Sequence, residues 1–181
     1  MEDFASAASR EQISIPSVEK VVQQWRKPSQ GRGKLNSDAA VKENRCGVGI
    51  IIRDGVGDVL LAAGVRMMDV SSPEEAEARA ILFGLQTAFD AGLRNLEVES
   101  DCLNVIKLLN GHKARTLTQV VVNDTLALSN LFSFCSFSFA NRSCNKVAHS
   151  VAQLSLSYDE MRVWLEDHPL TCFPLSWRTR F

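Results

Sequence analysis

The stretch PEEAEARAILFGLQTAFDA, residues 73–91, decides how the rest of the chain is interpreted. Its apolar residues recur with the 3.6-residue period of an amphipathic helix, and Glu77 lies at the centre of the apolar side. Glu75 and Arg79 fall on the opposite side, which we expect to face water. Because a lone ionised carboxylate is costly to bury, the inward position of Glu77 predicts that a partner compensates its charge.

Both ends of this helix carry sequence signals. Ser72 is a good N-cap, Pro73 suits the first helical position, and Glu75 completes a capping box. Gly92 predicts the end of the helix.

The flanking residues predict strands and further helices in an alternating order. Hydrophobic runs bounded by turn residues indicate five strands, at residues 35–41, 46–54, 58–67, 95–100 and 132–140. The sequence Asp54 to Gly57 predicts a tight hairpin between the second and third strands. Helical periodicity indicates three more helices, at residues 101–110, at residues 119–131 and, capped by Ser143, at residues 143–156. This order predicts an α/β fold with a mixed sheet and helices on its faces.

Two more acids accompany Glu77 in this pattern. Asp38 lies in the first strand and Asp101 directly follows the fourth, so the three carboxylates could converge at one edge of the sheet and hold divalent metal. Each acid also has a structural alternative. Asp38 could lie on a solvent face, Asp101 could cap the following helix, and a helical Glu is usually solvated.

Composition narrows the class of protein. The chain has 181 residues and a net charge of −1, which fits one globular domain without a general basic field for nucleic acid. We expect a domain at residues 34–158 between tails at residues 1–33 and 159–181. Five cysteines without a Cys-x-x-Cys motif argue against a zinc ribbon and a disulfide framework. With neither a signal peptide nor a membrane anchor visible, an intracellular location, nuclear or cytoplasmic, is expected.

The ordered segments resemble the ribonuclease H type 1 family, in particular its plant reverse-transcriptase-like branch derived from non-LTR retroelements. The resemblance is carried by KLNSDAAV with GVGIIIRD, EAEARAILFGL, LEVESDCLNVI and NRSCNKVAHSVA. It implies a three-layer fold with a five-stranded mixed sheet and helices on both faces. It also implies cleavage of the RNA strand of RNA–DNA hybrids with Mg²⁺ held by Asp38, Glu77 and Asp101.

Two positions depart from the family pattern. The family's fourth acid stands four residues after an Asn, where this chain has His149 after Asn145. The implied catalytic and metal set is then Asp38, Glu77, Asp101 and His149, and a nitrogen ligand suits Mn²⁺ better than Mg²⁺. Many active members have Gly where Ala39 follows the first acid.

Nucleic-acid contacts are expected from backbone, small and cationic groups near the acids, because an RNA-containing duplex is recognised by its shape and phosphates. The candidates are Asn36, Ala39, Ala40, Lys113, Arg115, Arg142, Asn145 and Lys146. Two functions remain open from the sequence. One is a metal-dependent hybrid ribonuclease. The other is a domesticated retroelement domain that binds nucleic acid or protein with little or no catalysis.

Overall fold

The computed structural model describes residues 23–43, 45–113 and 117–165. Its strands are β1 (Gly33–Lys42), β2 (Arg45–Arg53), β3 (Val59–Met67), β4 (Asn95–Ser100), β5 (Phe134–Phe139) and β6 (Arg162–Leu165). Its helices are α1 (Pro73–Asp90), α2 (Leu103–Leu109), α3 (Leu117–Ser129) and α4 (Lys146–Ser155), with a short 3₁₀ helix, η1 (Arg142–Cys144), before α4. The predicted mixed α/β architecture is therefore confirmed.

The sheet has six strands in the order β5-β4-β1-β2-β3-β6. Strands β1, β2, β3 and β6 pair antiparallel, whereas β4 pairs parallel with both β1 and β5. The crossover from β3 through α1 to β4 makes the parallel half possible. It also brings the end of β4 beside the middle of β1, with Ser37 opposite Ser100.

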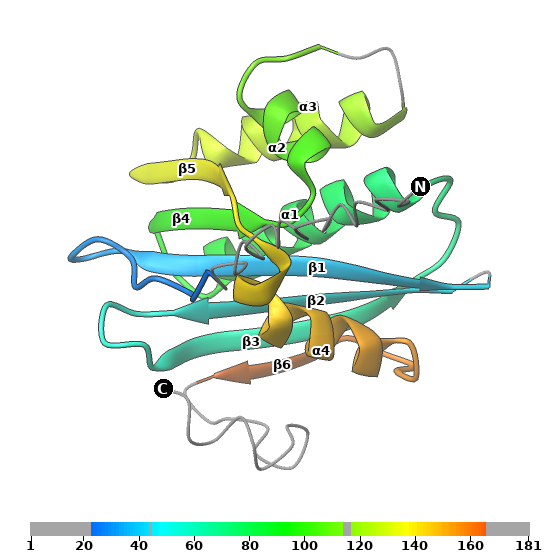
Figure 1. Ribbon diagram of the computed structural model, residues 1–181, viewed down its shortest axis with the longest axis horizontal. Helices are drawn as coiled ribbons and strands as arrows, with labels where there is room; N and C mark the ends of the chain where they lie inside the picture. Colours follow the sequence, from blue (N-terminus) through cyan, green and yellow to red (C-terminus); the bar gives the residue numbers. More distant parts are fainter. Residues whose placement is uncertain (1–22, 44, 114–116, 166–181) are drawn as a thin grey trace, which may run out of the picture.

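Helices cover both faces of the sheet, as Figure 1 shows for α1 and α4. The α1 side holds the main hydrophobic core, in which Leu35 and Ile50 of the sheet and Ile81 and Leu85 of α1 are fully buried. On the opposite face α4 lies on β2 and also contacts β1 and β3. The close approach needs glycine, because a methyl group at Gly49 would overlap the backbone of α4.

Two of the signals that predicted the start of α1 act as expected: Ser72 is the N-cap and Pro73 is the first helical residue. The capping box forms only in part, because the Glu75 side chain accepts the N–H of Ser71 and not that of Ser72. Ser72 caps the helix by accepting a hydrogen bond from the backbone N–H of Glu75, at 3.1 Å. Glu75 itself was expected to face water, and this was wrong. Its carboxylate accepts the Ser71 N–H and pairs with Arg79, and these contacts leave the residue 3% exposed. The polar side of α1 is thus partly covered near its start.

Two other expectations need correction. The sheet has six strands instead of five, because β6 adds to the free edge of β3. Its four residues fall in the expected tail 159–181 and are too few to give a periodic signal. The last helix starts at Lys146 instead of Ser143, since Asn141 caps η1 by accepting the Ser143 N–H.

Two further properties concern only the described part of the chain. None of its helices combines the length and apolar character needed to cross a membrane. Its four cysteines are free thiols.

Candidate functional site

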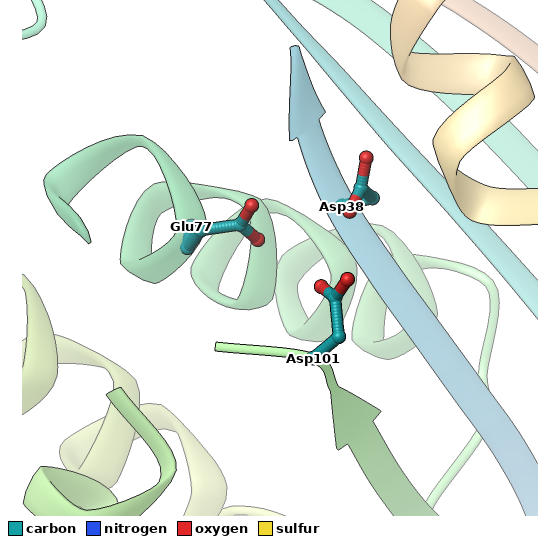
Figure 2. Close-up of side chains that lie close together, drawn as sticks. All are labelled: Asp38, Glu77 and Asp101. Atoms are coloured by element: carbon teal, nitrogen blue, oxygen red, sulfur yellow. The ribbon is translucent and has the colours of Figure 1, made fainter. Parts of the chain in front are cut away.

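Asp38, Glu77 and Asp101 converge at the place where the parallel pairing of β1 and β4 ends. One carboxylate oxygen from each residue lies within 4.8 Å of the others. Figure 2 shows the side chains pointing toward one another from β1, α1 and the end of β4. Strand β4 ends at Ser100, which pairs with Ser37 of β1. The residue that follows each of these serines, Asp101 or Asp38, is an acid of the cluster. Helix α1 supplies Glu77 from its second turn.

Burial and mutual repulsion raise the pKa values of two of these acids. The pKa of Asp38 is raised to about 6, chiefly by burial, and only partly offset by a hydrogen bond to His149. The pKa of Glu77 is raised to about 9, first by burial and then by the charges of Asp38 and Asp101. The Glu77 Oε2 atom is buried and has no hydrogen-bond partner among the described residues. Proximity of three such groups is unfavourable unless a proton or a cation is shared.

Asn145 ties two of the acids to the sheet. The residue is 1% exposed, and its Nδ2 lies 2.8 Å from the Ser37 carbonyl oxygen. The same nitrogen lies 3.3 Å from Oδ1 of both Asp38 and Asp101. Asn145 was expected to contact nucleic acid, but its amide is buried and donates within the site. Its position four residues before His149 marked it in the sequence, whereas its partners come from other elements.

His149 lies at the rim of the cluster. Its Nδ1 is 2.8 Å from Asp38 Oδ2, and its side chain is 40% exposed. Among the described residues, the group whose ligand atoms converge contains the three carboxylates and not the imidazole. A role for His149 as fourth metal ligand therefore stays a prediction.

The other expected nucleic-acid residues divide into exposed and buried groups. Lys113, Arg142 and Lys146 are exposed, and Ala39 is partly exposed. The Arg142 Nε atom lies 3.7 Å from Asp101 Oδ2, beside the cluster. Arg115 lies outside the described residues.

Two of the expected contacts are buried. Asn36 is 0% exposed and its side chain is hydrogen-bonded to Trp25, Arg53 and Glu99. Ala40 is 4% exposed. Both residues are buried in this structure, so a contact between their side chains and nucleic acid stays a prediction that the exposed surface does not support. Strand alternation predicts which side of a sheet a residue faces, but not whether another segment covers that side.

Comparison of the sequence with known protein families assigns this chain to one of them. Residues 36–155 match the reverse transcriptase-like family. The chain belongs to this family. The matched segment contains Asp38, Glu77, Asp101 and His149, and it extends from the middle of β1 to the end of α4.

Solved structures give the fold of this family member. RNase H1 from the halophilic archaeon Halobacterium salinarum NRC-1 is 24% identical, with a TM-score of 0.66 over 70% of this chain and 98% of the archaeal one. The N-terminal RNase H domain of a Mycobacterium tuberculosis protein is 19% identical, with a TM-score of 0.63 over 69% of this chain and 93% of that one. LC11-RNase H1 in complex with an RNA/DNA hybrid is 18% identical, with a TM-score of 0.61 over 68% and 96% of the two chains. No curated protein matches the sequence. These likenesses show a ribonuclease H-like fold.

The residues of the cluster fit a hard divalent cation. Oxygen ligands from carboxylates are those that Mg²⁺ and Mn²⁺ prefer. The unpartnered Glu77 Oε2 provides a free lone pair, and a cation would relieve the repulsion that raises the Glu77 pKa. Binding must also displace the proton that Glu77 carries near neutral pH, so metal binding and proton release are coupled.

Proposed function

We propose that this protein is a metal-dependent endoribonuclease that cleaves the RNA strand of RNA–DNA hybrids. The observation that carries the proposal is the convergence of Asp38, Glu77 and Asp101 within 4.8 Å at the end of two parallel strands. A ribonuclease H-like fold surrounds the cluster, and one structure of that fold, LC11-RNase H1, was solved with an RNA/DNA hybrid.

Asp38, Glu77 and Asp101 would hold Mg²⁺ or Mn²⁺. When bound, such ions activate water at neutral pH and stabilise the negative charge on the leaving oxygen. The remaining contributions come from the chain itself. Asn145 keeps Asp38 and Asp101 at a fixed separation through its Nδ2 group. Because the carboxylates are held before substrate binds, little reorganisation is needed during the reaction.

His149 is proposed as a fourth ligand or as the group that orients Asp38. Its Nδ1 already lies in hydrogen-bond contact with Asp38 Oδ2. A nitrogen ligand would favour Mn²⁺ over Mg²⁺, because Mg²⁺ strongly prefers oxygen.

Hybrid binding would use the exposed groups around the cluster. Arg142 and Lys146 flank the start of α4 and are both exposed, so each can neutralise a phosphate. Ala39 is partly exposed next to Asp38 and can lie against the sugars of a minor groove. Lys113 is exposed in the loop that follows α2 and extends the basic set. With these groups, recognition would follow duplex shape and phosphates instead of base sequence.

The second candidate is a retroelement-derived domain that binds nucleic acid with little or no catalysis. The histidine at the position of the fourth acid favours it, because the converging metal group then has three carboxylates. The convergence of Asp38, Glu77 and Asp101 favours the nuclease.

The decisive assay uses an end-labelled RNA–DNA hybrid with Mg²⁺ or Mn²⁺. Duplexes of the same sequence in DNA and in RNA test strand and substrate selectivity. The Asp38→Asn protein, purified in the same way, controls for contaminating nucleases. Cleavage of the hybrid RNA by wild type alone supports the nuclease. If the protein binds the hybrid in EDTA but cleaves it with neither Mg²⁺ nor Mn²⁺, the result supports the binding domain.

A further inference from the structure

Residues 23–32, which we call the N-terminal strap, lie over the part of the sheet that α4 leaves open. Asp38 pairs with Gly49, which packs against the backbone of α4, so alternate residues before Asp38 face the same side. Two of them, Asn36 and Lys34, are 0% and 5% exposed. The strap covers them, and in Figure 1 it is the dark blue segment that precedes β1.

Trp25 anchors the strap near its start. Its ring lies 3.7 Å from the guanidinium carbon of Arg53, which is a cation–π contact. Its Nε1 donates to Asn36 Oδ1 at 3.0 Å, and Arg53 Nη2 donates to the same oxygen at 2.9 Å. The Asn36 Nδ2 group donates to Glu99 at 3.0 Å. The tryptophan therefore completes a buried polar network that begins two residues from Asp38.

A second anchor holds the end of the strap closest to the carboxylates. The carbonyl oxygen of Gln23 accepts a hydrogen bond from Ser143 Oγ at 2.6 Å and one from Cys144 Sγ at 3.4 Å. Ser143 and Cys144 belong to η1, which contains no buried residue. A three-residue turn without a buried residue is weakly held by its own packing, and the two bonds to Gln23 add a restraint from the strap.

The turn η1 leads directly to the groups that organise the carboxylates. Arg142, in η1, faces Asp101, and Asn145, the next residue after η1, donates to Asp38 and Asp101. The Asn145 N–H is itself bonded to the Arg142 carbonyl at 3.2 Å. A shift of η1 would therefore move the Asn145 amide away from both acids.

We infer that the N-terminal strap is a positioning element of the carboxylate cluster: Trp25 fixes it to β1 and β2, and Gln23 fixes η1 and, through η1, Asn145. The inference rests on the proposed function, because it assigns the strap a part in the metal site proposed above. It also predicts that the strap holds η1 and Asn145 in place when no metal is bound. The strap, residues 23–32, lies outside the segment that matches the family, which begins at residue 36.

The test compares four full-length variants with wild type. Trp25→Leu removes the anchor, Trp25→Phe keeps a ring over Arg53 but loses the Nε1 donor, and Ser143→Ala removes the bond to Gln23. Trp164→Leu is the matched control, since Trp164 packs on Tyr158 at the far edge of the sheet, with ring centroids 6.3 Å apart. Hydrogen exchange is followed at residues 142–149 in metal-free protein, and Mn²⁺ affinity by calorimetry.

We expect faster exchange at the amides of Cys144, Asn145 and His149 in Trp25→Leu and Ser143→Ala. We also expect a loss of about tenfold in Mn²⁺ affinity, the usual effect of removing a group that orients metal ligands. Trp25→Phe should show a smaller loss. The double variant Trp25→Leu with Ser143→Ala should lose less than the product of the two single losses, because both act through one restraint.

The possible results separate the inference from the proposed function. Unchanged exchange at residues 142–149 in folded Ser143→Ala would overturn the inference, and so would unchanged exchange in folded Trp25→Leu. Equal changes in Trp164→Leu would overturn it as well. Faster exchange together with unaltered Mn²⁺ affinity would also overturn it. If wild type binds no Mn²⁺ and cuts no hybrid, the proposed function fails, while selective faster exchange would still establish that the strap fixes η1 and Asn145.

Discussion

The Nδ1 atom of His149 lies 2.8 Å from the Oδ2 atom of Asp38, so α4 places an imidazole directly against the first carboxylate of the cluster. Asp38 is 3% exposed and offers its other oxygen, Oδ1, to Asn145. Both oxygens of the acid are therefore oriented by residues at the start of α4. The position of this helix on the sheet is as important for the site as the acids themselves.

The metal preference of cleavage tests the role of His149. If the imidazole is a ligand, wild type should cleave faster with Mn²⁺ than with Mg²⁺. His149→Asp should then shift the ratio of the two rates toward Mg²⁺ by about tenfold, because it supplies a hard oxygen ligand. The measurement is the initial rate on a labelled hybrid with each metal. His112→Asp, a change at an exposed histidine in the loop after α2, is the control. The same Mn²⁺ to Mg²⁺ ratio in wild type and His149→Asp would remove His149 from the metal site.

Neutral isosteres of the acids should separate activity from stability. Asp38→Asn and Glu77→Gln should each abolish cleavage, because each removes a proposed metal ligand. Glu77→Gln should also raise the free energy of unfolding of the metal-free protein at pH 8 by at least about 1 kcal/mol, the equivalent of one pKa unit. The reason is that burial and two neighbouring acids oppose ionisation of Glu77. Denaturant unfolding measures the change, and Asp90→Asn at the exposed end of α1 is the control. A less stable, still active Glu77→Gln protein would show that Glu77 is a structural residue.

The stability of the metal-free protein should fall as pH rises from about 5 to about 9. The pKa of Glu77 is raised from 4.5 to about 9 and that of Asp38 from 3.8 to about 6. The folded state therefore binds more protons than the unfolded state in this window, and raising the pH favours unfolding. Thermal melts in EDTA across the window measure the slope. Glu77→Gln should flatten it above pH 6, and a slope of equal size in that variant would contradict the assignment.

The contact between α4 and the sheet should tolerate no side chain at Gly49. An added methyl group would overlap the α4 backbone at Ala148 and Ala152. Gly49→Ala should cost at least about 2 kcal/mol of stability, as overpacking of a tight contact does. Because Gly49 pairs with Asp38, the displaced helix should also weaken Mn²⁺ binding. Gly55→Ala, where a methyl group meets nothing within 4 Å, is the matched control. Equal melting temperatures for the two variants would mean that α4 can move without cost.

The features that the sequence determined by itself are those with local causes. The start of α1 depends on Ser72 and Pro73, and helical periodicity alone turns Glu77 inward. The alternation of strands and helices predicted a mixed sheet, and the connectivity of β3, α1 and β4 then required a parallel pair. Asp38, Glu77 and Asp101 were identified as candidates from their places in these predicted elements. Asp38 lies in the first strand, Glu77 on the apolar side of the helix, and Asp101 directly after the fourth strand.

Only the tertiary structure decided how these elements meet. Asn36 and Asp38 look equivalent in an alternating strand, but the strap covers Asn36 while Asp38 remains part of the site. The four residues of β6 form a strand because β3 offers a free edge, not because of their own periodicity. Asn145 and His149 reach the acids because glycines let α4 approach the sheet closely. The pairing of β6 with β3 and the contacts of Asn145 and His149 with Asp38 join residues about a hundred positions apart. No local pattern of periodicity, capping or turn chemistry specifies contacts over that separation.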